Sequence, residues 1–264
     1  MIKTIKKYSR VYRHFVSTSV ALGTSFRLHF VLLILMDLLF YFSSLASVSF
    51  IFDHVNQIGP WQRTEFMFFV CFMLAVDHLH MTFVSESFWE LSHQIRTGSL
   101  DFLLLKPIGT VFHAFLRFIR PASALNIVVT WGLLIYYGQA IELLWWQWIL
   151  MPILMLLSLT LLVTMEILVS CSMFITIESF GINFLRMQLQ QLARWPDFVY
   201  RLWARRILTF GLPVILVGSA PVHWLLSPFE FKFMAYMFLA IIVMWVIIAP
   251  VWRISLSRYE SASS

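Results

Sequence analysis

The strongest constraint on this chain is the spacing of its long apolar segments. These segments cover residues 28–52, 65–85, 119–137, 146–177, 206–226 and 232–252. A helix of about 20 mostly apolar residues crosses the roughly 30 Å hydrocarbon core of a bilayer, so each segment predicts a membrane span. We therefore predict an all-α polytopic membrane protein with six transmembrane helices in a single domain, residues 1–264.

The composition agrees with burial in lipid. The chain is 60% hydrophobic and 12% charged, with a mean hydropathy of +0.83. A soluble domain is about 45–50% apolar and about 25% charged, so the excess apolar surface needs lipid. Cys71 and Cys171 lie in apolar segments and do not indicate a disulfide framework. The net charge of +6 lacks the dense basic run of a nucleic-acid site.

Basic residues predict the orientation of the spans. With six alternating spans, 17 of the 19 Lys and Arg residues fall on one side, and Arg63 and Lys232 are the exceptions. Part of this count comes from the loop predicted between the fourth and fifth spans, which holds Arg186, Arg194, Arg201, Arg205 and Arg206. Since basic loops stay in the cytoplasm, both termini are predicted to be cytoplasmic.

The two ends of the chain have different sequence patterns. In residues 1–27, Lys and Arg alternate with Ile5, Tyr8, Val11, Tyr12 and Phe15 at near-helical spacing. This pattern predicts a helix lying in the membrane interface, and the alternative is a disordered basic tail. Residues 253–264 predict a polar cytoplasmic tail.

Among the polar residues inside the predicted spans, we single out four as candidate functional residues: Asp37, Asp77, His80 and Glu166. Charged groups cost about 2.5–3.5 kcal/mol at the bilayer centre, so they should face protein or water. Asp77 and His80 are three residues apart and share a helical face, whereas His78 points elsewhere. We favour helix contacts that orient the bundle; a pathway, a subunit interface or proton or metal chemistry are the alternatives.

The segment 88–107 lies between the second and third spans and is amphipathic. Gly98 predicts a helix end and Pro107 a break, which gives a short helix, a turn and a second helical piece at the membrane surface. The alternative is an ordinary interfacial loop. The sequence contains no phosphate-binding loop G-x-x-x-x-G-K-[ST] and no G-x-G-x-x-G fingerprint, so no nucleotide cofactor is expected on this chain.

Two stretches carry a family resemblance. GSLDFLLLKP (98–107) and RRILTFGLPVILVGSAPVHWLL (205–226) resemble the type-2 ABC exporter permeases, and in particular a bacterial branch with six spans and no nucleotide-binding domain. The resemblance implies a permease subunit of the bacterial inner membrane that works with a dimer of ABC ATPase subunits, on which ATP and Mg bind. It also implies a second permease, identical or paralogous, with the pathway between the two and the first, second and fifth spans contributing.

The resemblance further implies a coupling helix that docks on the ATPase. Its docking residues would be Glu86, Trp89, Glu90, Ser92, His93 and Arg96, and the turn behind it would use Gly98, Asp101, Lys106 and Pro107. The competing hypothesis is an ATP-independent carrier or channel in which Asp77, His80 and Glu166 handle protons or ions. A membrane enzyme is disfavoured, because no nucleophile–base set or metal cluster is evident.

Overall fold

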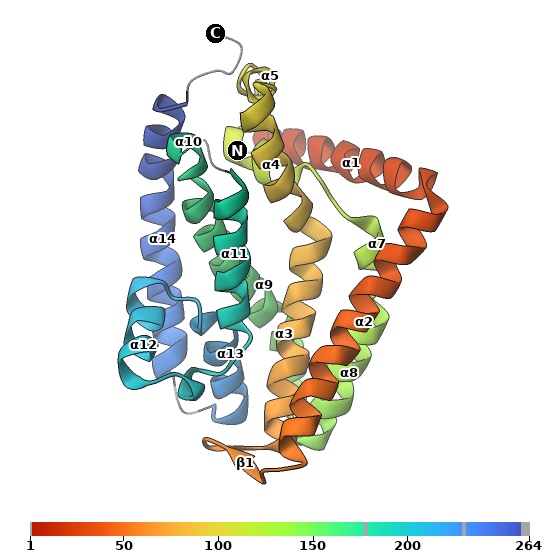
Figure 1. Cartoon of the computed structure of the whole chain (residues 1–264), viewed down its shortest axis with the longest axis vertical. Helices are drawn as coiled ribbons and strands as arrows, with labels where there is room; N and C mark the ends of the chain where they lie inside the picture. Colours follow the sequence, from red (N-terminus) through yellow and green to blue (C-terminus); the bar gives the residue numbers. More distant parts are fainter. Residues whose placement is uncertain (1, 177–178, 229–230, 260–264) are drawn as a thin grey trace.

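The protein is a bundle of helices that run mainly along one axis, shown by a computed structural model in Figure 1. The structure describes residues 2–176, 179–228 and 231–259. The helices are α1 (Ile2–Ser25), α2 (Arg27–Phe52), α3 (Arg63–Phe83), α4 (Ser85–Thr97), α5 (Leu100–Leu104), α6 (Thr110–Leu116), α7 (Pro121–Ala124), α8 (Ile127–Ala140), α9 (Trp145–Ser170), α10 (Met173–Thr176), α11 (Ser179–Ala193), a 3-10 turn (Asp197–Val199), α12 (Leu202–Arg206), a π-helical turn (Ile207–Gly211), α13 (Leu216–Leu226) and α14 (Lys232–Ser257). One antiparallel hairpin, β1 (Gln57–Ile58) with β2 (Trp61–Gln62), lies at the end opposite α1.

Helix α3 forms the centre of the bundle, because it is apolar on nearly every side. It contacts α2, α8, α9 and α13, and Phe66, Phe69 and Phe72 are fully buried. A capping box starts the helix: the backbone N–H of Gln62 donates to the Glu65 carboxylate at 2.8 Å. By contrast, α2 and α14 expose most of their apolar side chains, so lipid or another subunit must cover them.

The candidate spans number four to six among the described residues. Four helices are long and apolar enough to cross a bilayer: α2, α3, α9 continued through α10, and α14. Two more crossings arise only if each of two bent pairs counts as one span. The pair Thr110–Leu116 with Pro121–Ala140 bends by 68°, and the pair Leu202–Gly211 with Leu216–Leu226 bends by 102°. The predicted third and fifth spans are therefore not straight helices.

The prediction of a loop between the fourth and fifth spans is wrong, because most of this segment is helix α11. The fourth segment breaks after Ser170, and its predicted end, Ile177, lies outside the described residues. Helix α11 contacts α4 at one end and α13 at the other, so it runs along much of the bundle. Arg186 lies on this helix, and Arg194 lies in the turn directly after it. Acidic partners on neighbouring helices make the burial of Arg186 and the partial burial of Arg194 tolerable.

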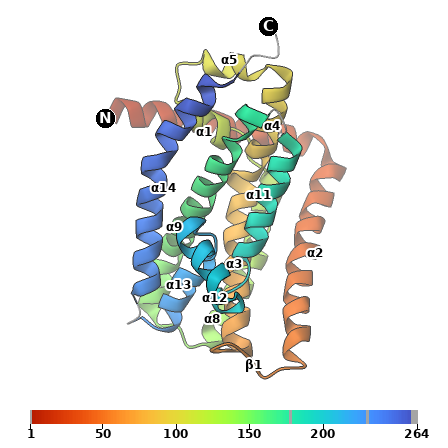
Figure 2. The same cartoon turned by 60° about the vertical axis from the view of Figure 1, so that its left-hand side comes forward.

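Helix α1 lies across one end of the bundle in both views (Figures 1 and 2). The rings of Tyr8, Tyr12 and Phe15 pack against Phe112 of α6, with centroids 4.8 to 6.4 Å apart. The helix predicted from the spacing of these residues is present as α1. Its position at a membrane surface stays a prediction. At the other terminus, α14 continues to Ser257, so the predicted tail begins as helix; residues 260–264 lie outside the described part.

Two glycines provide a matched test of packing around α3. A Cβ at Gly218 of α13 would contact the Met73 sulfur and come within 2.8 Å of the Phe69 ring, whereas a Cβ at Gly132 of α8 meets nothing within 4 Å. We expect Gly218→Ala to destabilise the protein by about 1–3 kcal/mol, since overpacking forces buried side chains to move. Gly132→Ala should leave stability unchanged or raise it slightly. Thermal unfolding of both purified variants checks this, and equal melting temperatures would contradict it.

Candidate functional site

A buried charged cluster joins three helices of the bundle. Glu166 of α9 accepts a hydrogen bond from Arg186 of α11 at 3.1 Å, and its other oxygen lies 2.6 Å from His80 Nε2 of α3. All three residues are at most 2% exposed. Gln190, one turn beyond Arg186, places its side-chain nitrogen 3.2 Å from His80 Nδ1. The cluster therefore fixes the relative positions of α3, α9 and α11.

The same cluster reaches the helix that carries the predicted docking residues. The Arg186 guanidinium lies over the Phe88 ring of α4 at 4.5 Å and within 5.9 Å of the Trp89 ring. Cation–π contacts of this kind are worth about 2 kcal/mol when they are desolvated. Trp89 is exposed on its other side. A displacement of α4 would therefore change the ring contacts of Arg186 directly.

A second ion pair lies beside a small lateral cavity. Arg194, directly after α11, donates to Asp77 of α3 at 2.8 Å, and its guanidinium lies 4.6 Å from the centre of the Phe40 ring of α2. The cavity has a volume of about 190 Å³ between α2, α3 and α11, and both members of the pair line it. Ser44 and Ser47 of α2 add hydroxyl groups to a lining that is otherwise mainly apolar.

The fourth predicted polar residue, Asp37, has different partners. It accepts hydrogen bonds from Ser123 at 2.6 Å, from Asn126 at 3.4 Å and from Arg120 at 3.4 Å, which connects α2 to the start of the third predicted span. Asp77 and His80 do face the same neighbour, α11, as their spacing predicts. They bind different partners there, however, and do not form one site. Nowhere in the described ranges do three His, Cys, Asp or Glu side chains gather as a metal site requires.

A fourth charged cluster, around Asp197, was not predicted from the sequence. Asp197 is fully buried between Arg205 and His223, with His223 Nε2 at 2.7 Å, and its backbone N–H donates to Ser219 Oγ at 3.0 Å. The cluster holds the bent α12–α13 segment closed. From the sequence, residues 205–226 were identified as a span and as a stretch with a family resemblance, and nothing in their spacing shows that the chain doubles back.

The predicted docking helix is α4, which ends as expected at Gly98 in the left-handed conformation (φ 71°). Glu86, Trp89, His93 and Arg96 are exposed, Glu90 is half-buried and Ser92 is buried. Beyond the turn, α5 stands at the tip of the molecule (Figures 1 and 2). There Phe102 is 72% and Leu105 is 82% exposed. Neither side chain is among the docking residues predicted from the sequence.

The turn behind α4 is held by α1. Lys7 Nζ donates to the Pro107 carbonyl at 2.6 Å, and the Gly109 N–H donates to the Tyr8 hydroxyl at 3.0 Å. Lys106 is exposed as a residue, but its ammonium lies 3.3 Å from His113 Nε2. Partial desolvation, and secondarily the charge of Arg117, lower the pKa of Lys106. Helix α1 and the docking segment thus form one unit.

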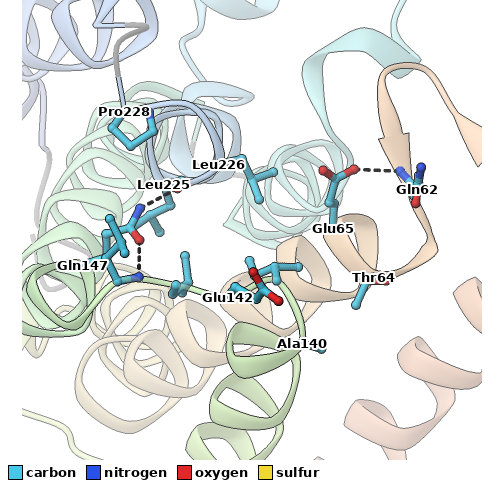
Figure 3. Close-up of a pocket in the computed structure, with 12 residues that line it drawn as sticks. Gln62, Thr64, Glu65, Ala140, Glu142, Gln147, Leu225, Leu226 and Pro228 are labelled. Atoms are coloured by element: carbon cyan, nitrogen blue, oxygen red, sulfur yellow. Dashed lines mark hydrogen bonds between the residues drawn. The ribbon is translucent and has the colours of Figure 1, made fainter.

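A polar pocket of about 400 Å³ lies at the opposite end of the bundle (Figure 3). Glu65 and Glu142 both line it, and Figure 3 shows Glu65 already engaged by the Gln62 backbone. Gln147 is also satisfied, since it accepts from the Leu144 N–H and donates to the Leu225 carbonyl. The pocket therefore presents Glu142 as its exposed carboxylate and was not predicted from the sequence.

The buried pair provides a direct test of what holds α11 in place. We expect Arg186→Met to destabilise the protein by about 3–5 kcal/mol, because it leaves Glu166 buried without its cation. The double variant Arg186→Met/Glu166→Gln should recover part of this loss. As a control, Arg63→Gln breaks the exposed pair with Asp53 (3.2 Å) and should cost less than about 1 kcal/mol. Unfolding of the three variants in detergent is the measurement, and similar losses in all three would refute the assignment.

Comparison with known proteins identifies the chain's family. Residues 38–263 match the family described as ABC-2 family transporter protein. No curated protein and no solved structure matches the chain. The matched region includes the Glu166 and Asp197 clusters, the Asp77–Arg194 pair, the α4–α5 tip and the candidate spans from residue 38 onward, whereas Asp37 and the start of α2 precede it. The chain belongs to the ABC-2 transporter family and is a membrane component of an ABC transporter.

Proposed function

We propose that this chain is the permease subunit of an ATP-driven exporter in the bacterial inner membrane. Separate ATPase subunits bind ATP and Mg, and a second permease, identical or paralogous, completes the pathway. Family membership and the missing phosphate-binding loop support this division of labour. Both termini are cytoplasmic in this proposal. The basic residues of α1, of the segment 96–120 and of the end of α14 still gather at the α5 end after the α11 arginines are set aside.

The single observation that carries the proposal is the exposed apolar tip. Phe102 of α5 and Leu105, which directly follows α5, are highly exposed at the tip, next to the charged residues Asp101 and Lys106. Large exposed apolar side chains are typical of an interaction site, and such side chains dominate interface energies when they fill a pocket. We therefore centre the ATPase-docking surface on α5 and the outer face of α4, which carries Trp89, His93 and Arg96.

The α4–α11 contact supports a route for transmission. A force on the α4–α5 tip reaches Arg186 through Phe88 and Trp89, and then α3 and α9 through Glu166 and His80. The turn directly after α11 carries Arg194, which lines the lateral cavity against α2. We propose that this cavity faces the pathway shared with the second permease.

An ATP-independent carrier is less well supported. Asp77, His80 and Glu166 each have a buried or partly buried partner that neutralises or satisfies them. A proton or ion carrier needs such groups to be free to exchange a ligand. No observation on these residues favours exchange over structural pairing.

Replacing the tip residues tests the docking proposal. Phe102→Ala/Leu105→Ala should weaken ATPase binding about 30-fold, since loss of a central apolar anchor costs about 2 kcal/mol or more. The measurement is the ATP hydrolysis and the ATPase-to-permease ratio of the complex purified through a tag from native membranes.

The matched control is Phe50→Ala at the opposite end of the molecule, where the side chain is 67% exposed. It should keep the full complement of ATPase. If the unmodified chain retains no ATPase, or if the tip variant and the control retain equal amounts, docking at α5 is excluded.

The pathway proposal is tested by cysteine labelling. Cys71 and Cys171 are both buried, so background labelling should be low. Ser44→Cys lies in the lateral cavity and should react with a charged methanethiosulfonate in the assembled transporter at least about tenfold faster than Ser43→Cys, which lies outside the cavity lining. The thiolate is the reactive form and needs a polar, hydrated environment. Equal rates at the two positions would argue against a hydrated pathway here.

A further inference from the structure

A larger cavity lies at the elbow between α1 and α2, beside the Arg120–Asp37 pair. Its volume is about 520 Å³. One wall is the elbow itself, with Leu22, Phe26 and Phe30, and the other is the segment 118–122 that leads into α7. Figure 1 shows α1, α2 and α7 converging in this region. Gly23 allows the close approach, because a Cβ there would come within 2.8 Å of Pro121 Cγ.

The elbow combines the chemistry of a headgroup boundary with access to lipid. Phe26 and Leu22, which line the cavity, are 71% and 63% exposed. Helix α1 crosses the end of the bundle while α2 turns along its apolar length (Figure 2). Exposed apolar side chains beside a basic helix are typical of the plane where acyl chains meet headgroups. With α1 in its predicted position at the membrane interface, the cavity opens at the level of phospholipid headgroups.

Two opposite charges line the cavity. Arg120 contacts Asp37 through one nitrogen at 3.4 Å, and its buried Nε has no hydrogen-bond partner among the described residues. Glu86 is exposed at the first turn of α4 and contributes a carboxylate to the same lining. A ligand that complements both groups has an anionic and a cationic part close together, and the apolar wall requires a hydrocarbon chain attached to them.

We propose that the elbow cavity binds one zwitterionic phospholipid with a primary ammonium headgroup. The phosphate lies at Arg120, the ammonium at Glu86, and an acyl chain leaves along Phe30 and Leu33 of α2. A carboxylate receives N–H donors from a primary ammonium but none from a quaternary one, which sets the preference within the zwitterionic class. The site is independent of the proposed transport function, because it rests on the lipid contact of this chain alone.

The test is native mass spectrometry of the purified chain after equilibration with equal amounts of phosphatidylethanolamine, phosphatidylcholine and phosphatidylglycerol that share the same acyl chains. We expect phosphatidylethanolamine to be retained preferentially. Leu33→Trp fills the cavity and should lower the retention of phosphatidylethanolamine about tenfold. A change of this size equals the loss of one charge-assisted contact. Leu32→Trp, on the neighbouring outward position that does not line the cavity, should leave retention unchanged.

Charge variants separate the two contacts. Glu86→Gln should remove the preference for phosphatidylethanolamine over phosphatidylglycerol, while Arg120→Gln should reduce retention of all three lipids. Because Arg120 also contacts Asp37, Arg120→Lys serves as a second variant that keeps the positive charge and should restore part of the binding. Equal retention in Leu33→Trp and Leu32→Trp, or a preference of the unmodified chain for phosphatidylglycerol, would overturn the proposal.

Discussion

The buried ion pair between Arg186 and Glu166 is the interaction on which the rest of the bundle depends. A guanidinium that is 1% exposed is tolerable in an apolar bundle only when its charge and its N–H groups are matched. Glu166 supplies the charge, and the Phe88 ring covers the guanidinium face. Because His80 shares the same carboxylate, α11 has one favourable register against α3 and α9.

That register determines which elements α11 contacts at each of its two ends. With α11 held by Arg186, the turn that directly follows the helix brings Arg194 to Asp77, beside the lateral cavity against α2. Towards the other end, α11 supports α4 and therefore the α5 tip. One helix thus contacts the proposed docking surface and lies beside the proposed pathway, and in the proposed function it is the element that would link motion at the two.

The polar groups of the membrane region serve structure first. Asp37 joins α2 to the third predicted span, Asp197 closes the bent α12–α13 segment, and Asp77 and Glu166 hold α11. Each carboxylate connects elements that are far apart in sequence. In an apolar environment such contacts specify which helices meet, since dispersion forces alone discriminate poorly between apolar faces.

From the sequence alone, the helical class, the apolar segments, the amphipathic face of α1 and the end of α4 at Gly98 could be predicted, because each depends on local periodicity or on one residue's conformational preference. Asp37, Asp77, His80 and Glu166 could be identified as residues needing partners, because a charge in an apolar segment demands one. Their partners, the burial of Arg186, the partial burial of Arg194, the bend of 102° at 202–226 and the elbow cavity were decided only by the tertiary structure. Arginines of a loop and of a buried helix carry the same charge in sequence, and only the positions of distant carboxylates distinguish them.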